Sequence, residues 1–147
     1  MDFRTYGFFD MDEAPVAPVE LEGLRVTIDR LVYQRLSESE SPGRPYSFVY
    51  FISIRNESPL AVTIKGRKWV VRHDDGTSLV LEGDGVVGEF PTVGPGERYS
   101  YNSRHIIATR TAMAEGAYLG LDETGRRVVV RIPRFGMVVP DNEFDAE

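Results

Sequence analysis

Apolar and polar residues alternate along most of this chain with the two-residue period of a β-strand. The clearest case is residues 46–56, where the even-numbered positions share one apolar face: Phe48, Tyr50, Ile52 and Ile54. Burying each of these side chains is worth about 1.5 to 3 kcal/mol, so a register slip of one residue would be very costly. The pattern predicts a strand here whose even-numbered face lies in the core.

Similar segments, separated by turn signals, predict further strands. They cover residues 24–34, 60–64, 67–73, 77–82, 98–103, 114–121, 126–132 and 135–139. The Asp-Gly dipeptide within residues 74–77 is typical of a tight hairpin, and Pro95-Gly96 favours a type II turn. No segment has a helical period. Many short strands joined by close turns predict an all-β protein built as an antiparallel β-sandwich.

Composition changes at both ends of the chain. Residues 1–20 have no sustained period and contain two prolines, so we expect an acidic arm there, followed by one domain over residues 21–140 and an acidic tail over residues 141–147. Six acids against Arg4 give the first 22 residues a charge of -5, and the last seven residues carry -4. Since the whole chain carries -6, the body of the domain is mildly basic.

The composition also bears on compartment and chemistry. The 147 residues contain no cysteine, which excludes disulfides, thiolate metal sites and a cysteine nucleophile. The N-terminus is acidic and aromatic, unlike a secretory signal, and no apolar run approaches the roughly 20 residues that cross a bilayer. We therefore expect a cytoplasmic protein that does not act at a membrane.

Three motifs resemble the ApaG domain family (DUF525). They are Arg-x-Trp at Arg67 and Trp69, GDGVVGE at residues 83–89, and PGE at residues 95–97, within a resemblance that covers residues 24–140. The resemblance implies a small sandwich of the immunoglobulin or fibronectin type III kind. It also implies a link to cobalt and magnesium efflux, which we expect to be indirect. Related domains are appended to F-box proteins and to a polymerase-delta-interacting protein, which implies an adaptor role.

The glycine motif also matches the letters GxGxxG of dinucleotide-binding loops. That fingerprint requires a helix after the last glycine, whereas here a proline-containing segment without helical period follows. We interpret the glycines first as a bulge or crossover between sheets. The alternative is a sensor of phosphate or of a nucleotide such as a dinucleoside polyphosphate, bound by Gly83, Gly85 and Gly88 with Arg67 or Lys68 nearby.

Other candidate chemistry is sparse. His73 and His105 are the only histidines, and Lys68 stands where family members often carry another, so we expect no metal site and no cofactor. Ser103 and His105 would share a strand face, but no acid is placed to orient the imidazole. We therefore expect no catalytic residues and no enzymatic activity.

The leading hypothesis is a non-catalytic protein-binding module that uses a sheet face, an edge strand or the loop at residues 83–89. Val49 and Phe51 are the candidate interaction face, because they add an apolar pair to the outer face of their strand. Trp69 is expected to join the two sheets in the core; the alternative, base stacking on a nucleic acid, is disfavoured by the acidic ends. The sequence leaves a homo-oligomer open.

Overall fold

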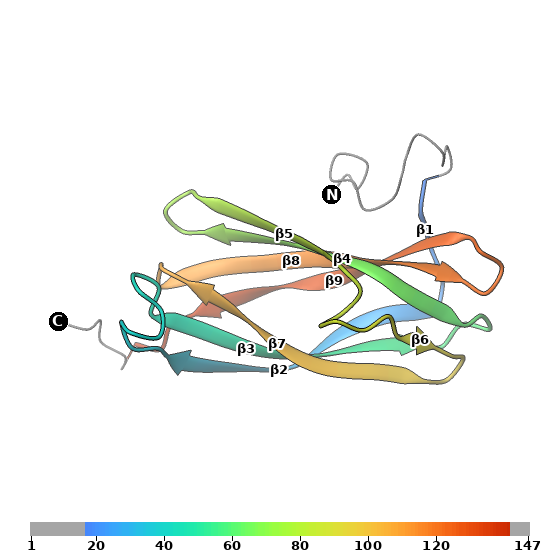
Figure 1. The fold of residues 1–147 in the computed structure, drawn as a ribbon, viewed down its shortest axis with the longest axis horizontal. Coiled ribbons are helices and arrows are strands. Elements are labelled where there is room, and N and C mark those ends of the chain that lie inside the picture. Colours follow the sequence, from blue (N-terminus) through green and yellow to red (C-terminus); the bar gives the residue numbers. More distant parts are fainter. Residues whose placement is uncertain (1–16, 142–147) are drawn as a thin grey trace.

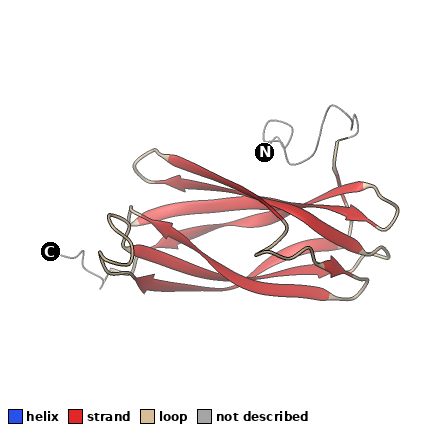
Figure 2. Ribbon diagram, viewed as in Figure 1, coloured by secondary structure: helices blue, strands red, loops and turns tan. Residues whose placement is uncertain are grey.

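The computed structural model describes residues 17–141, and these residues form two stacked β-sheets without any helix (Figures 1 and 2). No described segment is therefore a helix that could cross a membrane. The predicted antiparallel sandwich of the immunoglobulin or fibronectin type III kind is confirmed. The strands are β1 (Val19–Glu20), β2 (Leu24–Arg35), β3 (Tyr46–Asn56), β4 (Val62–His73), β5 (Ser78–Asp84), β6 (Thr92–Val93), β7 (Arg98–Ile107), β8 (Thr111–Asp122) and β9 (Arg127–Val138).

The two sheets differ in size. The six-stranded sheet has the order β1-β9-β8-β4-β5, with β6 paired to β4, and the three-stranded sheet has the order β2-β3-β7. All pairs are antiparallel except β1 with β9, which is parallel. Strands β1 and β5 therefore stand at the two ends of the larger sheet.

The core lies between the sheets, as the alternation in β3 predicts. Phe48, Tyr50, Ile52 and Ile54 are all buried there. Trp69 comes from the facing sheet, is 2% exposed, and lies with its ring centroid 5.0 Å from that of Tyr50. The expectation that this tryptophan joins the two layers is confirmed.

Strand β4 combines two segments that the sequence separates. The strand runs through without interruption, but its register against β8 shifts between Ile64 and Gly66, which is a β-bulge at Lys65. Because side chains alternate between the two faces of a strand, one extra residue moves every later side chain to the opposite face. As a result Trp69 points into the core with Ile64, whereas Lys68 lies on the outer face.

Other boundaries also differ from the prediction. The predicted strands at residues 126–132 and 135–139 form one strand, β9, because a register shift opposite residues 114–116 accommodates the proline between them. The two-residue strands β1 and β6 were not predicted, since a pattern needs more residues to show a period. Val19 and Glu20 of β1 fall inside the predicted arm, of which residues 1–16, like the tail beyond residue 141, lie outside the described residues.

Both predicted turns are present. Gly76 has a φ of +89° in the hairpin between β4 and β5, where the Thr77 amide donates to Asp75 Oδ1 at 2.9 Å. Gly96 has a φ of +79°, and the Glu97 amide donates to the Gly94 carbonyl at 3.0 Å, as a type II turn requires.

Candidate binding site at strand β5 and the glycine loop

Strand β5 is the most exposed of the longer strands of the sandwich. It pairs with β4 along one side and ends the strand order of its sheet. Figure 1 shows the β4–β5 hairpin standing away from the three-stranded sheet, and every residue of β5 except Gly83 is exposed. Three successive apolar side chains are consequently exposed: Leu79 by 37%, Val80 by 40% and Leu81 by 41%.

The glycine motif begins in β5 and ends in a tight turn. Val86 and Glu89 form a bridge in which the Val86 amide donates to the Glu89 carbonyl at 2.7 Å and the Glu89 amide donates back at 2.9 Å. Between them Val87 has a φ of +47° and Gly88 a φ of +81°, the signature of a type I′ turn. A positive φ is strained for a β-branched residue, so Val87 is held there by its surroundings.

Gly85 and Gly83 have different neighbours. Gly85 has a φ of +60°, and a Cβ on it would lie 2.2 Å from the carbonyl oxygen of Glu89, so a side chain there would meet fixed backbone. Gly83 instead makes room for Arg67, because a Cβ there would lie 2.8 Å from its Nη2. A side chain at position 83 would therefore displace the Arg67 guanidinium from its place against the loop.

Arg67 braces this loop, whereas Lys68 does not reach it. Arg67 Nη1 donates to the carbonyl oxygens of Asp84 at 2.8 Å and Gly85 at 3.1 Å. Lys68 follows it in β4 and is buried on the opposite face of the sheet. Among the loop amides, that of Gly85 donates to the Lys65 carbonyl at 2.8 Å, in addition to the two amides of the turn. The structure brings Arg67 together with Gly83 and Gly85, leaves Gly88 at the tip of the turn, and places Lys68 on the other face.

Two more apolar side chains are exposed in the segment that follows β5. Val87 is 57% exposed at the tip of the turn, and Phe90 is 54% exposed with Lys65 Nζ 5.7 Å from its ring centroid. We call the exposed residues Leu79, Val80, Leu81, Val87 and Phe90 the β5 edge. The sequence contains one signal for it, an apolar triplet that does not alternate.

Comparison with known proteins places the chain in a family. The family model of the ApaG domain matches residues 36–121. Protein ApaG of Vibrio cholerae is 38% identical over 95 residues, covering 65% of this chain and 75% of that protein, and its Escherichia coli counterpart is 36% identical over 104 residues, covering 71% and 83%. The chain belongs to the ApaG family. The matched segment contains Arg67, Trp69 and the glycine loop.

Solved structures agree with this assignment. A structural-genomics target determined by X-ray crystallography superposes with a TM-score of 0.73 at 28% identity, covering 85% of this chain and 93% of that one. A crystal structure of a protein described as ApaA from Bordetella pertussis gives 0.67 at 25% identity, covering 85% and 100%. The structural likeness thus covers 85% of this chain, a larger share than residues 36–121 alone.

Val49 and Phe51 lie on the outer face of the three-stranded sheet of this ApaG domain, as predicted, but both are half-buried. Arg30 lies over the Phe51 ring with its Cζ 5.7 Å from the centroid, and Arg104 pairs across the sheet with Val49. Arginine side chains thus border this apolar pair. It offers less free apolar surface than the β5 edge.

Ser103 and His105 share a strand face, as predicted, and that face points into the core. His105 is 4% exposed, with its ring centroid 4.6 Å from that of Trp69 and 4.9 Å from that of Tyr50. Burial lowers the pKa of His105 to about 4, so the imidazole is neutral at neutral pH. His105 is part of an aromatic cluster between the sheets.

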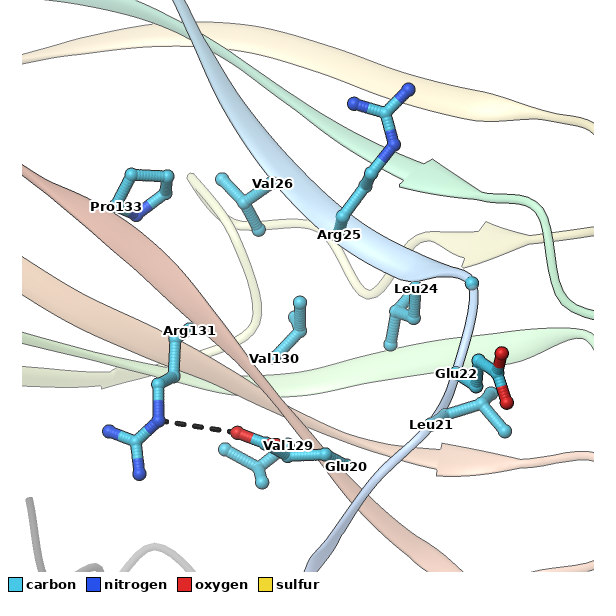
Figure 3. Close-up of a pocket in the computed structure, with 11 residues that line it drawn as sticks. Glu20, Leu21, Glu22, Leu24, Arg25, Val26, Val129, Val130, Arg131 and Pro133 are labelled. Atoms are coloured by element: carbon cyan, nitrogen blue, oxygen red, sulfur yellow. Dashed lines mark hydrogen bonds and ion pairs between the residues drawn. The ribbon is translucent and has the colours of Figure 1, made fainter.

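A cleft of about 570 Å³ opens where the chain passes from β1 into β2, beside β9 (Figure 3). Its floor is apolar, from Leu24, Val26 and Val130, and Arg131 and Glu20 form an ion pair of 3.2 Å at its border. Within residues 17–141, no three metal-binding side chains come together. The cleft therefore combines an apolar floor with a charged rim formed by the start of the described chain.

Proposed function

We propose that this ApaG protein is a non-catalytic protein-binding module that pairs an extended segment of its partner with strand β5. The observation that carries the proposal is the exposure of three successive apolar residues on a strand whose outer edge pairs with no strand among residues 17–141. Natural sheets usually protect an edge with lysine, proline, a bulge or a covering segment. The apolar triplet of β5 contains none of the protecting residue types.

An added strand would use the chemistry that an edge provides. The outward backbone groups of β5 supply hydrogen bonds, and side chains on both faces supply specificity. Leu79 and Leu81 lie on one face and Val80 on the other, since neighbouring residues of a strand alternate. The partner segment should therefore carry apolar residues on both of its faces.

The glycine loop would fix one end of this binding edge. Arg67 holds the carbonyls of Asp84 and Gly85, so the end of β5 is rigid. The type I′ turn then presents Val87 to solvent. A strained and exposed valine supports a contact role, because nothing in the fold benefits from its side chain.

The proposal also covers the compartment in which the protein acts and its relation to metal homeostasis. The protein acts in the cytoplasm, and any relation to cobalt or magnesium homeostasis passes through its partner. An adaptor role of this kind rests on the ApaG resemblance and on the exposed edge.

The edge can be tested by affinity capture with matched variants. We expect a partner that co-purifies with the wild-type chain to be lost from Leu81→Lys, because a charge at an edge blocks strand pairing. Phe51→Ser is the control on the other exposed sheet face and should retain the partner. If Leu81→Lys keeps the partner and Phe51→Ser loses it, the binding site is the face with Val49 and Phe51 and not the β5 edge.

The phosphate or nucleotide sensor is the second candidate, and one observation favours it. Arg67 lies against Gly83 and beside Gly85, so a cation is already at the loop. The guanidinium and several loop amides donate to backbone carbonyls, however, which reduces the donors left for an anion. Titrating pyrophosphate while following the amide resonances of residues 83–89 tests it, and unshifted resonances at millimolar concentration would refute it.

A further inference from the structure

The outer face of the three-stranded sheet is rich in arginine. The odd-numbered residues of β3 mark this face, since the even-numbered ones point into the core. The strand registers place these arginines on it: Arg25, Arg30, Arg55, Arg98 and Arg104. Arg55 is half-buried and the others are exposed. Strands β2, β3 and β7 contain no lysine, and their only acid is Asp29, so this face is strongly basic.

Three of these arginines lie side by side across the sheet. Arg55 of β3 pairs with Arg25 on one side and with Arg98 on the other. Like charges directly opposite each other destabilise a sheet. Arg25 Nη2 lies 3.2 Å from Glu57 Oε1, and Arg55 is 3.6 Å from the Asp29 carboxylate. Arg98 has no such neighbour among residues 17–141, so the row keeps uncompensated positive charge.

An aromatic ring and a hollow lie in the middle of this basic face. Phe51 is half-buried there, with Arg30 Cζ 5.7 Å from its ring centroid. Beside the ring is a hollow of about 400 Å³, which is also bordered by Asp29, Ser100 and Asn102. This volume is within the range of about 300 to 1,000 Å³ that is usual for ligand pockets. The face therefore combines cations for phosphate groups with an apolar seat for a flat ring.

We propose that this face binds single-stranded RNA. Arginine holds phosphate through its planar fork and also stacks on flat rings, so arginine without lysine suits a nucleic acid better than a simple anion. Proteins that bind single strands combine a cationic surface with aromatic side chains on which bases stack. From Arg98 to Arg104 the face extends about 20 Å along β7, which suits a short site of about four nucleotides.

Asp29 separates the role of the hollow from that of the arginines. The hydrogen bond from Ser53 lowers the pKa of Asp29, so its carboxylate is ionised at neutral pH and repels a phosphate group from the hollow. A base fits there instead, because its amino group can donate to a carboxylate. Ser100 and Asn102 provide a hydroxyl and an amide at the border of the hollow. These groups can bond the 2′-hydroxyl, which distinguishes RNA from DNA.

The attraction is local, because the whole chain carries a charge of -6. It is also independent of the proposed function, since β5 belongs to the other sheet (Figure 1). Nuclease removes RNA from an extract and leaves protein partners as the source of any capture or crosslink at position 51. The two proposals can therefore fail separately.

Fluorescence anisotropy of a labelled RNA of about 12 nucleotides tests the proposal with the full-length chain. We expect saturable binding whose logarithm falls with that of the salt concentration, by about 0.7 for each phosphate contact. Arg98→Gln combined with Arg104→Gln should weaken binding about ten-fold or more and reduce that slope by about 1.4. Arg131→Gln combined with Arg134→Gln in β9 changes the net charge equally and should bind as the wild type does. Equal weakening by both pairs, or no binding by the wild type, would overturn the proposal.

Further comparisons test the stacking and the identity of the ligand. Phe51→Leu keeps the apolar bulk and should weaken binding about five-fold or more, whereas Phe51→Tyr keeps the ring and should not. Duplex RNA, inorganic polyphosphate and single-stranded DNA of the same sequence should each bind several-fold more weakly. Unchanged binding by Phe51→Leu, or equal binding of the duplex or of polyphosphate, would contradict base stacking. Equal binding of single-stranded DNA would contradict the assignment to RNA.

Discussion

His105 makes the stability of this domain depend on pH. Its native pKa of about 4 lies below the value of about 6.5 in the unfolded chain, so the unfolded state binds a proton first as pH falls. The contribution of the neutral His105 to the free energy of unfolding is therefore fully present above pH 6.5 and is lost as the pH falls from 6.5 to 4. Urea unfolding should show the wild type losing about 2 kcal/mol more than His105→Phe between pH 7 and 5. The same loss in both proteins would contradict a buried neutral imidazole.

Val87 is the strained residue of the glycine loop. Its φ of +47° costs a β-branched residue about 1 to 2 kcal/mol, and asparagine tolerates this region better. Val87→Asn also creates the Asn-Gly dipeptide that type I′ turns favour. We expect about 1 kcal/mol of added stability in denaturant unfolding. Partner binding should weaken, since the exposed valine is lost. A variant that is not more stable would contradict the strain at Val87, and one that binds the partner as well as the wild type would contradict the contact role.

At the level of the strands, β4 and β8 approach each other closely at Gly116. A Cβ there would lie 2.2 Å from the Lys68 carbonyl oxygen, so Gly116→Ala must push the two strands apart. We expect a loss of about 3 kcal/mol or more in the free energy of unfolding. Gly136→Ala is the matched control in β9, where the new Cβ would be 3.5 Å from Met113 Sδ, and should cost no more than about 1 kcal/mol. Equal losses of unfolding free energy in the two variants would contradict this account, because they would show that β4 and β8 can move apart at Gly116 at little cost.

The strands also show where sequence reasoning succeeds. The alternation in residues 46–56 determines β3 and its buried face, because both are properties of one segment. The bulge at Lys65 is different: one inserted residue decides that Arg67 faces the loop and Lys68 the outer face, and Gly66 alone indicates only an irregularity. Exposure of Leu79 to Leu81 depends on how far the β4–β5 hairpin stands away from the other sheet. That distance is a property of the assembled sandwich, so no local pattern contains it.

For the molecule as a whole, the β5 edge also determines how it can assemble. If the partner strand belongs to a second copy, the wild type should be a dimer in light scattering that Leu81→Lys converts to a monomer, because two β5 strands would pair edge to edge. A dimer that persists in Leu81→Lys would place its interface on another surface. In either case the sandwich itself should remain folded, since Leu81 lies outside the core.

Site-specific photo-crosslinking tests the central claim most directly. A photoreactive residue at position 81 reports on the β5 edge, and one at position 51 reports on the outer face of the three-stranded sheet. In extract containing the native partner, we predict a discrete crosslinked product from position 81 and none from position 51. Crosslinking from position 51 alone, or from neither position, would contradict binding at β5.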